Sequence, residues 1–154
     1  MNSSQIKKTQ LDQLMPLILE ELAAGRSVRF SPSGSSMLPM LREGVDSVVL
    51  SPLPSKLKKY DLPLYQRTSG QYVLHRVVKA GQTYTCIGDN QFYKETGLQH
   101  NQMIALVTVF SRNGKDFSTN HIFYRFYCHI WHYSRPVRHF ISRAFHWLRR
   151  RIKK

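Results

Sequence analysis

The middle of the chain, from Ser27 to Lys115, is a succession of short segments rich in β-branched and aromatic residues. Such segments are typical of strands when turn sequences separate them. The turn sequences are Thr-Ser-Gly at 68–70, Ala-Gly-Gln at 80–82 and Arg-Asn-Gly-Lys at 112–115, and each is suited to a hairpin. The pattern therefore predicts a mainly β fold built as an antiparallel β-domain. The expected strands cover residues 28–30, 47–50, 62–67, 71–79, 83–87 and 103–111.

Both ends of the chain have helical patterns instead. A first helix is predicted over residues 11–24, because apolar residues recur at helical spacing and Gly25 stands at a place suited to a C-cap; Pro16 is expected in or near its first turns. After Asn120, aromatic residues and cations are interleaved, and Pro136 divides the segment into two expected helices. The second is a basic amphipathic helix. Its apolar face contains Val137, Phe140, Ile141, Ala144, Phe145, Leu148 and Ile152.

The expected organisation is an N-terminal helix at 1–25, a β-domain at 26–117 and a basic aromatic helical tail at 118–154. A chain of 154 residues fits one domain with one core. Its 42% hydrophobic and 21% charged residues exclude a disordered or collagen-like chain. Cys86 and Cys128 are expected to be buried thiols, and they give no metal-ligand spacing, so no metal or cofactor is predicted.

The N-terminal sequence lacks the pattern of a secretory leader. Its longest apolar run, from Leu14 to Leu19, is short, and Glu20 and Glu21 follow it. Nowhere do about eighteen apolar residues follow one another, as a membrane-spanning helix requires. We therefore expect a protein that is cytoplasmic or attached to the surface of a membrane.

A loop rich in serine, Ser31-Pro-Ser-Gly-Ser-Ser-Met-Leu-Pro-Met-Leu41, lies between two expected strands. A serine nucleophile needs an adjacent base and donors for the developing oxyanion. Gly34 permits an unusual backbone angle and Pro39 stiffens the exit, so Ser36 could be presented with its own N–H free. Taken alone, such a loop is most often only a turn. Whether this loop carries a nucleophile or is only a turn depends on the motifs in the rest of the chain.

Three sequence boxes follow one another in this region: Gly34-Ser-Ser-Met-Leu-Pro39, Tyr72-Val-Leu-His-Arg-Val-Val78 and Cys86-Ile-Gly-Asp-Asn90. The first is similar to the G-x-S-M-x-P nucleophile box of the serine peptidase superfamily that contains signal peptidase I and the self-cleaving LexA-type repressors. The resemblance covers about residues 26 to 110, and the ordered set is more specific than any one box. It implies a serine endopeptidase with Ser36 as the nucleophile, which cleaves extended leader or signal-type peptides through an acyl-enzyme.

The resemblance also assigns the base. His75 stands where bacterial signal peptidases carry a lysine and the endoplasmic-reticulum type a histidine, and a neutral imidazole can accept the serine proton at pH 7. Lys79 is the fallback base. Asp89 is the first choice to orient the imidazole and Glu95 the second. Asp89 could instead hold a turn, because Gly-Asp-Asn favours turns.

The oxyanion donors are less specified. Bacterial signal peptidases commonly have a hydroxyl residue where this chain has Gly34, so backbone N–H groups, including that of Ser36, are the natural donors. The hydroxyls of Ser33 and Ser35 could assist. Met37 and Pro39 are expected to shape the loop or its pocket, and the alternative for Met37 is packing in the core.

The charge of the chain is uneven. The formal net charge is +14, and residues 121–154 contain nine Lys or Arg and no acid. This favours a polyanionic partner, and we expect the tail to attach peripherally to anionic membranes and to be dispensable for the chemistry. The alternatives are a non-catalytic basic module that binds anionic membrane or nucleic acid, and a helical appendage that packs on its own β-domain. Specific nucleic-acid binding is not expected, because one N-terminal helix leaves no room for a helix-turn-helix.

Overall fold

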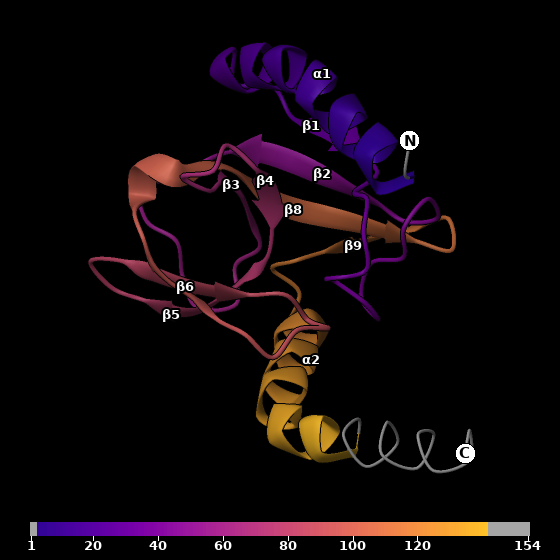
Figure 1. Cartoon of the computed structure of the whole chain (residues 1–154), viewed down its shortest axis with the longest axis vertical. Helices are drawn as coiled ribbons and strands as arrows, with labels where there is room; N and C mark the ends of the chain where they lie inside the picture. Colours follow the sequence, from indigo (N-terminus) through magenta and orange to yellow (C-terminus); the bar gives the residue numbers. More distant parts are fainter. Residues whose placement is uncertain (1–2, 142–154) are drawn as a thin grey trace.

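The computed structural model describes residues 3–141, and this part of the chain is mainly β, with two antiparallel sheets and three helices, one of which is the short 3-10 helix η1 (His100–Gln102) (Figure 1). The larger sheet has the strand order β1-β2-β8-β3-β4, with β9 paired to β8. It is built from β1 (Val28–Phe30), β2 (Ser47–Pro52), β3 (Pro63–Gln66), β4 (Tyr72–Leu74), β8 (Met103–Arg112) and β9 (Lys115–Ser118). The smaller sheet contains β5 (Arg76–Ala80), β6 (Tyr84–Ile87) and β7 (Glu95–Leu98).

The three expected turns all join hairpins. Residues 68–70 connect β3 to β4, residues 80–82 lie between β5 and β6, and residues 112–115 turn β8 into β9. The prediction from turn composition is therefore confirmed. Two strands were not expected: β9 is exposed along its whole length and β7 contains Gly97, so neither has the apolar, β-branched pattern of a strand.

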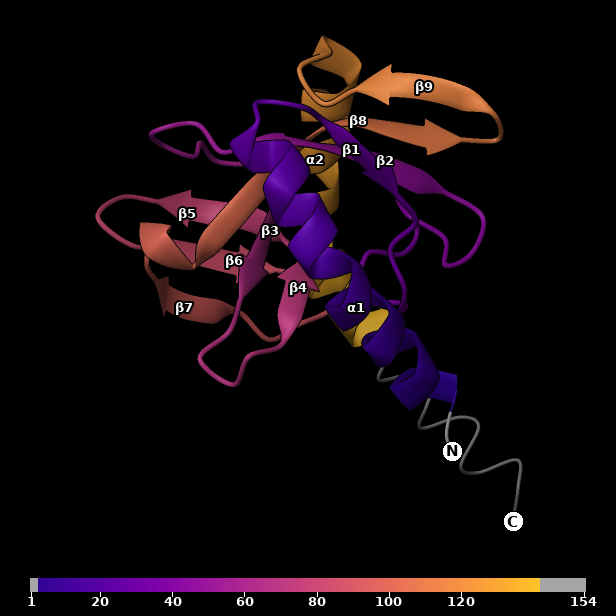
Figure 2. The same ribbon diagram turned by 90° about the horizontal axis from the view of Figure 1, so that it is seen from above.

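The expected strand over 71–79 is divided in two. His75 separates β4 from β5, and the two halves belong to different sheets, as seen from above in Figure 2. The apolar pattern is continuous through this region because both halves are buried. The change of sheet matters for the site, since it places His75 where the chain passes from one sheet to the other.

Helix α1 (Ser3–Ala23) begins earlier than the expected residue 11, and Pro16 lies within it rather than near its first turns. The polar residues before Leu11 carry no apolar periodicity, which is why the pattern did not include them. Met15, Ile18 and Leu22 are buried against the larger sheet in the main core cluster. Gly25 follows the helix with φ +76°, which supports the expected C-cap.

Helix α2 (Ile122–Tyr133) lies at the opposite end of the molecule from α1 (Figure 1) and is followed, after Ser134, by helical residues 135–141. Tyr124 and Cys128 of α2 are buried in the same core cluster as α1. The expected tail is therefore attached to the β-domain over its described part. Residues 142–152 of the expected apolar face lie outside the described residues.

Both cysteines, Cys86 and Cys128, are buried and unbridged, as expected. Burial raises the pKa of the Cys86 thiol to about 12, so this group stays protonated at neutral pH. Within residues 3–141 no helix is long and apolar enough to cross a bilayer.

Candidate active site

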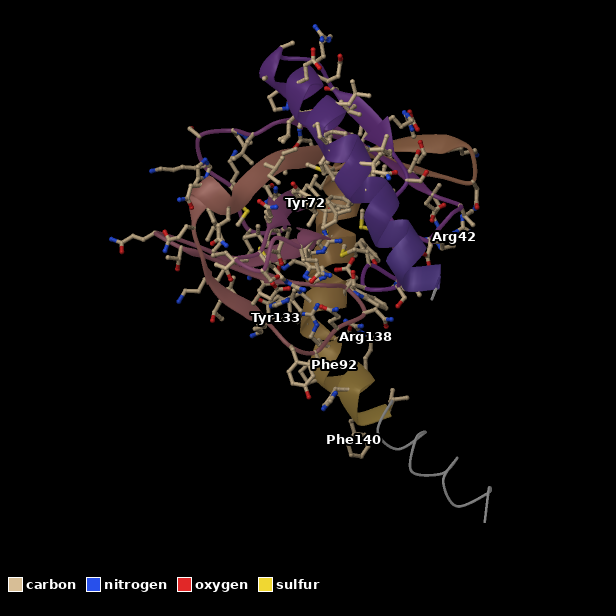
Figure 3. The ribbon with its side chains drawn as sticks, turned by 45° about the horizontal axis from the view of Figure 1, so that its top comes forward. Arg42, Tyr72, Phe92, Tyr133, Arg138 and Phe140 are labelled. Atoms are coloured by element: carbon tan, nitrogen blue, oxygen red, sulfur yellow. The ribbon has the colours of Figure 1, made fainter. Side chains whose placement is uncertain are left out.

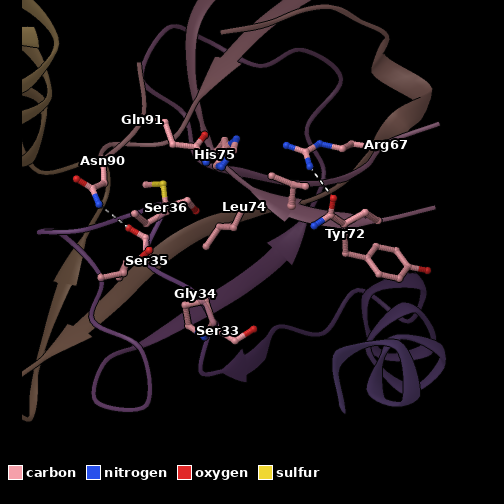
Figure 4. Close-up of a pocket in the computed structure, with 15 residues that line it drawn as sticks. Ser33, Gly34, Ser35, Ser36, Arg67, Tyr72, Leu74, His75, Asn90 and Gln91 are labelled. Atoms are coloured by element: carbon pink, nitrogen blue, oxygen red, sulfur yellow. Dashed lines mark hydrogen bonds between the residues drawn. The ribbon is translucent and has the colours of Figure 1, made fainter. Parts of the chain in front are cut away.

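The three sequence boxes meet at one pocket, which has a volume of about 350 Å³ (Figure 4). The loop of residues 32–37, between β1 and β2, lines one part of it. Residues 71–75, which include β4, line another, together with Leu41, Arg67, Asn90 and Gln91. Strand β4 ends the path of its sheet, with β3 as its one neighbour among the described strands, so the edge of β4 is available beside the pocket.

The side chain of His75 is 2% exposed, and its two ring nitrogens face different partners. Nδ1 lies 3.1 Å from Oε1 of Glu95 and 3.2 Å from the hydroxyl of Tyr65. A carboxylate only accepts hydrogen bonds, so the neutral imidazole carries its proton on Nδ1 and keeps the lone pair on Nε2. The chain thus presents a ring nitrogen that can act as a base.

Arg67, just after β3, fixes the carboxylate of Glu95. Arg67 Nε donates to Oε2 at 2.8 Å, and Arg67 Nη2 donates to Oε1 of the same group. Burial alone would raise the pKa of Glu95, but the hydrogen bonds and charge of Arg67 outweigh it, and the pKa lies below its ordinary value. Glu95 is therefore an anion at neutral pH and can stabilise a positive charge on His75.

The pKa of His75 lies below its ordinary value of 6.5. Burial is the largest cause, because it disfavours the charged ring, and the nearby Arg67 acts in the same direction. Glu95 opposes both by favouring the imidazolium. The imidazole is consequently neutral at pH 7, which is the state that a general base requires.

Gly88, in the third box, lies against both Ser36 and His75. A Cβ placed on Gly88 would be 2.6 Å from the carbonyl oxygen of Ser36 and 3.1 Å from Nε2 of His75. The carbonyl oxygen of Ser36 and Nε2 of His75 therefore lie close to the same point beside Gly88, and so they lie close to each other. The free ring nitrogen of His75 lies on the side of the serine loop, and a glycine is what permits this close approach.

The serine loop is held by the third box. Asn90 donates from its backbone N–H to the Ser36 carbonyl at 2.8 Å and from Nδ2 to the Ser35 carbonyl at 3.2 Å, as Figure 4 shows for the side chain. Gly34 has φ +94°, which confirms the expected unusual backbone angle. Within residues 3–141 the Ser36 N–H has no hydrogen-bond partner, and no hydrogen bond joins the Ser36 hydroxyl to His75.

Asp89 lies in a different environment from the one expected. Its carboxylate accepts from Nε of Arg76 at 2.8 Å and from Nη2 at 2.6 Å, and both side chains are fully buried. Its backbone carbonyl accepts from Nε1 of Trp131 on α2 at 2.9 Å. Among the described residues, the carboxylate that contacts His75 is that of Glu95, the second choice from sequence.

The structure brings together Ser36, His75 and Glu95. It adds Arg67 and Tyr65, which no sequence motif indicated, and it gives a position beside the site to Gly88, which the sequence analysis had only as a member of the third box. Lys79, the fallback base, is exposed on β5 and does not line the pocket. Met37 packs in the core and also lines the pocket, so both expectations for it hold.

Comparisons with protein-family models, curated proteins and solved structures find no match to this chain. Among the described residues, no cluster of three or more His, Cys, Asp or Glu is arranged to hold a metal ion. The chemistry of the site is therefore assigned from its own residues.

Proposed function

We propose that the protein is a serine endopeptidase in which Ser36, His75 and Glu95 act together, with a signal-peptidase-like identity as the sequence boxes suggest. One observation carries the proposal. Glu95 holds Nδ1 of His75, while Nε2 of the same ring faces Gly88 on the side of Ser36. An acid, an imidazole and a serine in this order are the parts needed to activate a hydroxyl for acyl transfer.

In the first step, the Ser36 oxygen attacks the carbonyl carbon of the peptide, and Nε2 of His75 takes the hydroxyl proton. The carboxylate of Glu95 stabilises the imidazolium through the Nδ1 proton. The free N–H of Ser36 is a donor for the oxyanion of the tetrahedral intermediate. His75 then returns the proton to the leaving amine, the peptide bond breaks, and water hydrolyses the ester on Ser36.

In this proposal Glu95, rather than Asp89, orients the imidazole. The contact distances favour Glu95, and Asp89 has both carboxylate oxygens bonded to Arg76. Asp89 has a supporting role, because the residues on either side of it, Gly88 and Asn90, contact the serine loop.

The substrate class is an extended peptide. Residues 72–74 of β4 line the pocket at the edge of the larger sheet, and an extended chain can pair its backbone with such an edge. The serine loop lines the same pocket, so a peptide bound along β4 would pass Ser36. The resemblance of the boxes implies leader or signal-type peptides with small residues before the cut.

The experiment is covalent labelling with a fluorophosphonate probe, followed by mass spectrometry of the labelled peptide. The label should map to Ser36 and disappear in Ser36→Ala. Ser35→Ala is the matched control, because its hydroxyl is one residue away on the same loop. Equal labelling of wild type and Ser36→Ala would overturn the assignment of the nucleophile.

A further inference from the structure

A second pocket, of about 430 Å³, lies between residues 92–94 and the helical residues around Arg135. It shares no lining residue with the pocket of Ser36. Figure 3 shows Phe92 and Arg138 near the base of the helical segment and Phe140 extending from it, away from the β-domain. The second pocket is therefore distinct from the pocket of Ser36.

The described lining of the second pocket contains cations and no acid. Arg135 is 8% exposed, and its Nε and Nη1 have no hydrogen-bond partner among the described residues. Lys94 lines the same pocket, as does His132, whose buried Nδ1 also has no partner there, and none of the described lining residues is an acid. Buried charges in proteins are normally paired, so this arrangement is suited to an anion.

Asp89 does not neutralise the pocket. Asp89 interacts electrostatically with Arg135, but both oxygens of the Asp89 carboxylate accept hydrogen bonds from Arg76. Burial lowers the pKa of His132, and the charges of Arg135 and Lys94 lower it further. An anion bound here would therefore meet two cations, Arg135 and Lys94, and two nitrogens of Arg135 that have no hydrogen-bond partner among the described residues.

A row of exposed apolar side chains runs along the outer surface of α2 and residues 135–141, at intervals of three or four residues. Each member is at least 54% exposed. Tyr133 belongs to this row and also lines the second pocket, so the two surfaces are continuous. The apolar row consists of Ile122, Phe126, Ile130, Tyr133, Val137 and Phe140.

We propose that this end of the protein binds the surface of an anionic membrane: the apolar row enters the interfacial layer, and the second pocket takes the phosphate of an anionic phospholipid headgroup. The charge of the chain favours this partner, because residues 121–154 contain nine Lys or Arg and no acid. Exposed aromatic and aliphatic side chains beside cations are suited to the membrane interface. The proposal goes beyond the peptidase activity and does not depend on it.

The test is co-sedimentation of the full-length chain with vesicles of phosphatidylcholine, alone or mixed with anionic phosphatidylglycerol. Binding should require the anionic lipid and weaken with salt. Lys94→Gln should weaken it about fivefold, the effect of one cation near an anionic surface. Lys115→Gln removes the same charge from the β8–β9 turn, which does not line the second pocket, and should have the smaller effect. Circular dichroism checks the fold of each variant.

Two further comparisons separate the parts of the proposal. Phe126→Ser should reduce sedimentation, whereas Leu17→Ser, at an exposed position of α1, should not. Inorganic phosphate should compete with vesicle binding more strongly than chloride at equal ionic strength. Binding of phosphate without any vesicle binding would indicate a site for free phosphate and overturn the membrane proposal. Equal effects of Lys94→Gln and Lys115→Gln would overturn the role of the pocket, and equal effects of Phe126→Ser and Leu17→Ser that of the apolar row.

Discussion

Replacement of Asp89 by asparagine tests whether this acid supports the fold or the chemistry. Asp89 is 0% exposed and Arg76 is 1% exposed, and two hydrogen bonds of 2.8 and 2.6 Å join them. Asp89→Asn removes the negative charge and leaves the guanidinium buried without compensation. Removing one partner of a buried ion pair costs about 3–5 kcal/mol. A domain of this kind is stable by only about 5–15 kcal/mol, so the loss is a large share of the total.

The position of the Asp89–Arg76 ion pair indicates which element would lose its packing contacts. Arg76 Nη1 also donates to the hydroxyl of Tyr124 at 2.6 Å, and the carbonyl of Asp89 accepts from Trp131. Both partners are on α2. We therefore expect Asp89→Asn to weaken the attachment of α2 as well as to lower the free energy of unfolding. The asparagine keeps one oxygen acceptor, which places the loss toward the lower end of the range, about 3 kcal/mol.

The assay is urea unfolding at pH 7, followed by circular dichroism, for wild type, Asp89→Asn, Arg76→Met and the double variant. The double variant should be less destabilised than the sum of the two single losses, because no buried charge is left unpaired in it. Labelling of Ser36 by the fluorophosphonate, measured without urea on the folded fraction, should persist in Asp89→Asn. An unchanged urea midpoint together with lost labelling would refute the structural role and make Asp89 the acid that orients His75.

Four further predictions concern the chemistry, each measured as the rate of fluorophosphonate labelling. His75→Ala should slow labelling by ~10²–10⁴-fold while Lys79→Ala leaves it unchanged, and the reverse result would make the lysine the base. The labelling rate of the wild type should fall only as the pH drops below 6.5, because the pKa of His75 is lowered. Glu95→Gln should slow labelling and move this fall in rate to still lower pH, because the carboxylate that raises the pKa of His75 is gone. A shift of the fall to higher pH would contradict the contact between Glu95 and His75. Gly88→Ala should slow labelling because its Cβ would meet the Ser36 carbonyl at 2.6 Å, whereas at Gly81 the nearest atom is 3.8 Å away and Gly81→Ala should be tolerated.

Local patterns were sufficient for much of the fold. The three turn sequences identified real hairpins because glycine and polar turn residues act through their own backbone angles. Local patterns could not predict that the apolar run over residues 71–79 divides into two strands at His75. Residues 71–79 read as a single strand, and only the packing of the two sheets decides where the chain leaves one and enters the other.

The choice between Asp89 and Glu95 depended on long-range pairing. His75 and Arg76 are consecutive, and consecutive side chains in extended backbone point to opposite sides. His75 thus faces Glu95 and the pocket, while Arg76 faces Asp89 and α2. The sequence did contain a signal for this, because a buried arginine beside the histidine needs a buried acid of its own. The contribution of Arg67 had no comparable local signal.

Residues 88–90 connect the described part of the tail to the serine loop. Asp89 accepts from Trp131 through its carbonyl, Gly88 accepts from Arg135 Nη2 at 3.4 Å, and Asn90 donates to the carbonyl of Ser36. The described part of the tail is thus bonded to Gly88 and Asp89, the two residues before the Asn90 that holds the serine loop. A tail that served only as a membrane attachment would need no such bonds. Its outward face, the apolar row, is free for a partner, so in the proposed arrangement the helix that meets the membrane also supports the site that cuts the peptide.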